Sequence, residues 1–157
     1  MSGQGRPELS TVDAAGLTLA IAATRWHAEI TDSLVDRATS AAKACGVTDP
    51  LVVRVAGAVE LAVVAQQLTQ RYDAVACLGA VIRGGTPHFE YVADAATTGL
   101  TQVSVATGKP IGFGLLTLDD EQQGLDRAGL PDSTEDKGAE AAEAAVATAV
   151  LLRSIRV

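Results

Sequence analysis

A histidine follows a glycine pair where a long apolar segment gives way to a polar turn. The apolar segment covers residues 74–82, and Thr86, Pro87 and His88 come shortly after it. Thr86 has the side chain of a helix N-cap, and Pro87 suits the first helical position because no donor is needed there. Free N–H groups at a helix start favour an anion, and the helix dipole there favours a neutral imidazole. A neutral imidazole beside a bound phosphate can accept and return protons near neutral pH.

Each part of this pattern also has a structural explanation. A histidine near a cap is often only a hydrogen-bonded structural residue. Gly84 and Gly85 are by default a tight turn. Because the pair precedes a helix, we favour a phosphate cradle built from the backbone N–H groups of Gly84, Gly85 and Thr86.

Other candidate side chains also follow apolar segments. Trp26 follows shortly after residues 17–23, and its ring can stack on a heterocycle or pack in the core. Glu60 follows the segment 51–56 and either binds a ligand or simply places a negative charge at a helix start. We expect His27 to face solvent, since two histidines without a suitable ligand spacing do not predict a metal site.

Two cations in the last third of the chain are further candidates. Arg127 is expected in the last turn of a short helix that ends near residue 128, where the dipole favours a cation anyway. Lys137 follows Ser133 and Thr134, either of which can cap the last helix. A lysine at a helix start is electrostatically disfavoured, so its position indicates a functional need.

Strand-like and helix-like segments alternate along the chain. We expect strands at 17–23, 51–56, 74–82 and 111–118, and helices with apolar positions over 30–45, 61–68 and 89–103, a short one before 128, and one over 134–155. Nearly continuous apolar strands of this kind predict a four-stranded parallel sheet with helices on both faces, a three-layer α/β sandwich. Ligands of open parallel sheets bind beyond the carboxyl ends of the strands, where the candidate residues lie.

Composition limits the classes of partner. The 157 residues are enough for one domain over 14–157, preceded by a polar segment at 1–13 that we expect to be flexible. A formal net charge of -7 without a basic stripe argues against nucleic acid and anionic membrane. Cys45 and Cys77 fit buried, reduced thiols. Without a signal-peptide pattern or a membrane-length apolar run, we expect a soluble, cytoplasmic protein.

Six motifs in order resemble the lumazine synthase family, from about residue 17 onward. The motifs lie at residues 25–27, 57–60, 79–92, 113–117, 125–129 and 135–138. The resemblance implies a flavodoxin-like fold and a transferase of riboflavin biosynthesis. Its two substrates are 5-amino-6-ribitylaminopyrimidinedione and 3,4-dihydroxy-2-butanone 4-phosphate. Its products are 6,7-dimethyl-8-ribityllumazine, phosphate and water, and it needs no metal or other cofactor.

The resemblance also implies residue roles. His88 is the general acid/base, Arg127 binds the substrate phosphate, and Lys137 lies near the phosphate end of the site. Trp26 stacks on the pyrimidine and Glu60 binds the ribityl hydroxyls. Ala58 and Val59 contribute backbone contacts beside Glu60, and Val81 and Ile82 match backbone positions that hold the pyrimidinedione.

Phe113 resembles an aromatic that enters the site from a neighbouring subunit, although a buried strand phenylalanine is the competing account. The family assembles as pentamers, sometimes joined into a hollow shell. A slightly long interval between Arg127 and Lys137 favours the free pentamer here.

Several positions depart from the family pattern. Ala62 and Ala93 stand where proline and cysteine are common in the family, and residues 118–120 replace a Thr-Asn-Thr type of sequence. Many relatives carry glutamine at the position of Gly85. These changes affect loop geometry and substrate affinity, and they leave the expected catalytic group in place.

Two other functions remain open: a carrier of the same fold that binds a flavin-like ligand without turnover, and a structural assembly protein. The presence of His88, Arg127 and Lys137 favours the enzyme over the carrier.

Overall fold

Four apolar segments form one parallel sheet. The computed structural model describes residues 5 and 11–156, so most of the segment predicted to be flexible lies outside the described residues. The strands are β1 (Leu19–Thr24), β2 (Leu51–Val55), β3 (Ala74–Ile82) and β4 (Ile111–Leu118). Their order is β2-β1-β3-β4, and every neighbouring pair is parallel.

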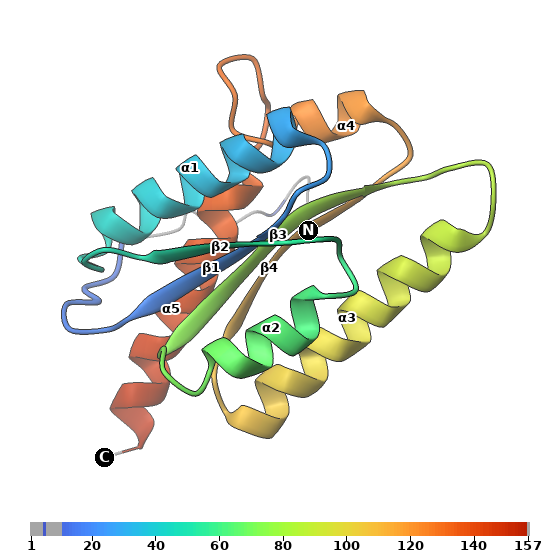
Figure 1. Cartoon of the computed structure of the whole chain (residues 1–157). Coiled ribbons are helices and arrows are strands. Elements are labelled where there is room, and N and C mark those ends of the chain that lie inside the picture. The colour runs from blue at the N-terminus through green and yellow to red at the C-terminus, as the bar shows by residue number, and fades with distance from the viewer. Residues whose placement is uncertain (1–4, 6–10, 157) are drawn as a thin grey trace.

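Five helices cover the two faces of this sheet. They are α1 (Ala28–Ala44), α2 (Leu61–Leu68), α3 (His88–Thr107), α4 (Glu121–Leu125) and α5 (Lys137–Ile155). Figure 1 shows α1 and α5 on one face and α2 and α3 on the other. Two buried apolar clusters, one on each face, hold the three layers together. The predicted three-layer, flavodoxin-like α/β sandwich is confirmed.

Small residues let the layers approach closely. A Cβ atom at Gly112 would lie 2.0 Å from the carbonyl oxygen of Ala141, so α5 rests directly on the backbone of β4. A Cβ atom at Gly138 would lie 2.3 Å from the carbonyl oxygen of Leu34, where α5 crosses α1. Close helix packing of this kind suits a chain whose aromatic content is only 3%.

Three predicted helix ends differ from the structure. Helix α3 begins at His88, one residue after Pro87, so Thr86 is not the N-cap. Helix α5 begins at Lys137 and is capped by Asp136, whose carboxylate accepts a hydrogen bond from the N–H of Ala139 at 3.0 Å. Ser133 is not the cap because its hydroxyl is used inside the preceding loop.

The third difference concerns α4. This helix ends at Leu125, so Arg127 lies beyond its last turn and not within it. The Arg127 guanidinium nevertheless donates from Nη1 to the carbonyl oxygen of Gln123 at 2.8 Å, and so it still caps the helix end.

The expectation for the two cysteines holds. Cys45 and Cys77 are buried and free, and burial raises the pKa of the Cys77 thiol to about 12. Among the helices of the described residues, none combines the length and the apolar character needed to cross a membrane.

Candidate active site

A cavity of about 310 Å³ opens at the carboxyl ends of β1, β2 and β3. Strand order reverses between β1 and β3, and ligands of open α/β sheets bind at such a point. The predicted site residues among its lining are Trp26, Ala58, Val59, Glu60, Val81, Ile82 and His88. The structure therefore gathers the expected pyrimidine-binding positions and the expected general acid/base around one hollow.

Trp26 stands at the rim of this cavity and is not a core residue. Its side chain is 65% exposed, which excludes the core-packing explanation. A Cβ atom at Gly57 would lie 3.7 Å from the indole Nε1 and 3.2 Å from Oε2 of Glu60. The absence of a side chain at Gly57 thus leaves room for a ring and a carboxylate to border the same space.

His27 also lines the cavity, a position that the sequence did not indicate. Its backbone is left-handed, with φ of 53°, and it precedes the first residue of α1. The His27 carbonyl accepts hydrogen bonds from the N–H of Thr31 at 2.9 Å and from its hydroxyl at 3.1 Å. This sharp turn places the ring half-buried, with its centroid 6.4 Å from that of Trp26.

Thr24 is a lining residue that the sequence did not single out. It is 1% exposed, and its hydroxyl has no hydrogen-bond partner among the described residues. A Cβ atom at Gly79 would lie 2.6 Å from this hydroxyl, so Gly79 makes room for it. A sequence signal for Thr24 does exist. Side chains alternate between the two faces along a strand, and Thr24 is the last residue of β1 on the face that packs against α2 and α3.

The glycine turn leads directly into the cavity wall. Residues 84–86 are exposed and lie between Ile82 and His88, both of which line the cavity. A Cβ atom at Gly84 or Gly85 would have no neighbour within 4 Å. Residues 84–86 do not line the cavity, but the turn that they form lies at the cavity edge and has open space around it.

Arg127 and Lys137 lie together, outside this cavity. The N–H of Lys137 donates to the carbonyl of Arg127 at 2.9 Å, which brings the two residues side by side. Lys137 Nζ lies 2.6 Å from Oε2 of Glu135 and 2.8 Å from Oε2 of Glu140. Arg127 Nε lies 3.8 Å from Oε1 of Glu135.

These acids explain how a lysine is accommodated at a helix start. Burial alone would lower the pKa of Lys137, but hydrogen bonds to Glu135 and Glu140 and their charges raise it above its usual value. Lys137 therefore stays charged. Its local pairing supplies a structural reason for its position beside the functional one.

Phe113 is also outside the cavity. It lies on β4, is 46% exposed, and borders a shallow groove against α3 together with Leu100 and Val105. The account of a buried strand phenylalanine is therefore wrong, because a large part of the ring is open to solvent.

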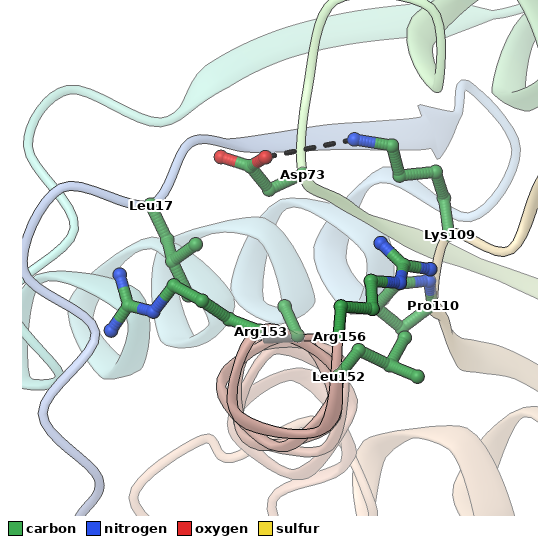
Figure 2. Close-up of a pocket in the computed structure, with 8 residues that line it drawn as sticks. Leu17, Asp73, Lys109, Pro110, Leu152, Arg153 and Arg156 are labelled. Carbon is green, nitrogen blue, oxygen red and sulfur yellow. Dashed lines mark ion pairs between the residues drawn. The ribbon is translucent and has the colours of Figure 1, made fainter.

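A second hollow, of about 250 Å³, lies at the opposite end of the sheet (Figure 2). Its cations already have partners: Lys109 pairs with Asp73 at 3.6 Å, and Arg156 Nη2 donates to the Gly108 carbonyl at 2.6 Å. Arg153 Nη1 donates to a backbone carbonyl at 3.3 Å. These contacts fasten α5 to the start of β1 and β4, so we do not place the active site here.

Known proteins resemble the whole chain. The family profile described as 6,7-dimethyl-8-ribityllumazine synthase matches residues 16–153. A protein of that name from Clavibacter sepedonicus is 63% identical over 99% of this chain and 99% of its own length. Those from Saccharopolyspora erythraea and Thermobifida fusca are 58% and 59% identical, over 99% of this chain and 94% and 91% of their own lengths. The chain thus belongs to the 6,7-dimethyl-8-ribityllumazine synthase family.

Proposed function

We propose that this chain condenses 5-amino-6-ribitylaminopyrimidinedione with 3,4-dihydroxy-2-butanone 4-phosphate. The products are 6,7-dimethyl-8-ribityllumazine, phosphate and water. The observation that carries this proposal is the cavity at the strand ends, which combines an exposed indole, a carboxylate and an imidazole at one hollow.

The pyrimidine occupies the cavity itself. Its ring lies against Trp26, where an exposed indole offers a flat apolar surface. Backbone groups of Val81 and Ile82, at the end of β3, form hydrogen bonds with the polar edge of the pyrimidinedione ring. Glu60 accepts hydrogen bonds from the ribityl hydroxyls, and the backbone of residues 58–59 supports the same chain of hydroxyls.

The phosphate of the second substrate lies at the cavity edge. Residues 84–86 are exposed next to the start of α3, and an added Cβ atom at Gly84 or Gly85 would meet nothing within 4 Å, so an anion can approach the backbone N–H groups there. Arg127 supplies the charge-assisted hydrogen bonds that an oxyanion needs, and Lys137 adds a second positive charge.

Arg127, Lys137 and Phe113 act on the cavity of an adjacent copy of the chain. Two observations support this arrangement: none of the three lines the cavity of its own chain, and Phe113 is exposed. Large apolar side chains also stand exposed on α2 and α3, among them Val63, Tyr91 and Val105. Exposed apolar surface of this kind marks an interface between proteins. The assembly is a homo-oligomer, and we favour the free pentamer.

Reaction steps follow from these positions. The pyrimidine amine condenses with the ketone and releases one water, and elimination of phosphate then leaves a new carbonyl group. The second nitrogen attacks this carbonyl and closes the ring with loss of a second water. His88 accepts the proton removed before phosphate departs and returns protons to leaving oxygen atoms. Much of the acceleration comes from holding the two substrates in one place.

A direct assay tests this function. Purified chain is mixed with both substrates, and lumazine formation is followed by its absorbance and fluorescence. We expect turnover above the spontaneous rate. Binding of the pyrimidine without acceleration would instead favour the carrier, and absence of ligand binding would favour the structural assembly protein.

A further inference from the structure

The turn between β3 and α3 has few contacts of its own. Its glycines, Gly84 and Gly85, lie in open space, and all residues from 83 to 88 are exposed. Within the turn, the N–H of His88 lies 3.5 Å from the hydroxyl of Thr86, a long and weak contact. If this turn is to place backbone donors and an imidazole accurately, contacts from neighbouring residues must fix its conformation.

Arg83 supplies that hold from the first position of the turn. Its N–H donates to the carbonyl of Leu118 at 2.8 Å, which ties the turn to the end of β4. Its Nε donates to Oδ1 of Asp119 at 2.9 Å. Its Nη1 donates to the carboxylate of Glu90 in the first turn of α3. The guanidinium carbon lies 4.3 Å from the ring centroid of Phe89.

These contacts join both ends of the turn through one side chain. Asp119 fixes Arg83 to the segment after β4, while Glu90 and Phe89 fix it to the start of α3. The segment after β4 is itself ordered, because the N–H of Asp119 donates to the side-chain oxygen of Gln123 at 2.9 Å. The path of residues 84–87 is thus set by two anchored ends.

Electrostatics keep Arg83 and Glu90 ionised together. Hydrogen bonds to Asp119 and Glu90 raise the pKa of Arg83, and the hydrogen bond from Arg83 lowers the pKa of Glu90. The Arg83 side chain is 45% exposed, so these ion pairs add little to global stability. Their effect is local, because they hold the turn in one conformation.

We propose that Arg83 is a positioning residue that fixes the turn at residues 84–87, and through it the phosphate cradle and His88. This role rests on the proposed function. A planar guanidinium can bind two carboxylates and lie over a ring at the same time, which an ammonium cannot do. The requirement is therefore for arginine and not merely for positive charge.

Arg83→Met tests the role because it keeps a long apolar side chain and removes the donors. We expect a KM for the ketose phosphate about tenfold higher and a turnover about 10- to 100-fold lower, since small misplacements of reacting groups are costly. The KM for the pyrimidine should stay within about twofold, because that substrate is held by other elements. The midpoint of thermal unfolding should be unchanged. Arg83→Lys should recover only part of the loss.

Lys109→Met is the matched control. It removes an ion pair at the opposite end of the sheet, that with Asp73, and should leave turnover and both KM values unchanged (Figure 2). Parental kinetics in Arg83→Met would overturn the positioning role. So would a lowered unfolding midpoint with equal losses for both substrates, which indicates a general structural defect. If the unaltered chain forms no lumazine, the proposed function fails first and this role fails with it.

Discussion

At the scale of single residues, His88 and Arg127 have separable tasks. His88→Ala should lower turnover by about 10²-fold or more, because a proton shuttle is lost, while the KM for the pyrimidine changes little. Steady-state kinetics with each substrate varied in turn measure this. If the variant instead lost pyrimidine affinity, His88 would be a binding residue.

Arg127→Ala should act on the other substrate. We expect a large rise in the KM for the ketose phosphate, because a charge-assisted pair with the phosphate is lost. The pyrimidine KM serves as the internal control in the same experiment. A variant with near-normal constants would contradict the phosphate assignment.

Residue types alone predicted only part of the site. The types and order of residues identified the cavity lining at Trp26, Glu60 and His88. They missed Thr24, because a strand residue without obvious chemistry leaves little mark in a sequence. They also did not indicate that His27, with its left-handed backbone at a helix start, lines the cavity. The separation of Arg127 from the cavity depends on how loops fold in three dimensions.

At the scale of elements, the crossing of α1 and α5 limits what can stand at Gly138. Gly138→Ala would force a Cβ atom to within 2.3 Å of the Leu34 carbonyl oxygen. We expect a loss of about 1–3 kcal/mol in the free energy of unfolding, as overpacking usually costs. Chemical denaturation measures it. Gly85→Ala, where the added atom meets nothing, is the control and should leave stability nearly unchanged.

Element types were predictable and their starting residues less so. Strands were evident from continuous apolar runs, and Gly46 and Gly108, both with positive φ, mark the ends of α1 and α3. The start of α5 was predicted wrongly because Ser133, Thr134 and Asp136 are all able to cap a helix. Only the hydrogen bonds of the loop decide between them.

At the scale of the whole molecule, the proposed sharing of sites between copies predicts complementation. His88→Ala and Arg127→Ala should each be nearly inactive alone. When the two are co-expressed, some sites combine an intact His88 from one chain with an intact Arg127 from its neighbour, and part of the activity should return. Co-expression of His88→Ala with a second inactive variant at its own cavity, Trp26→Ala, is the control. Hybrids no more active than that control would place all groups in one chain.

Trp26 gives the molecule a built-in reporter. It is the single tryptophan of the chain and stands 65% exposed at the rim of the cavity. Its emission should therefore change when a heteroaromatic ring covers it and stay constant when distant parts of the molecule are altered. Ligand affinity can then be titrated without labels, even in variants that no longer turn over.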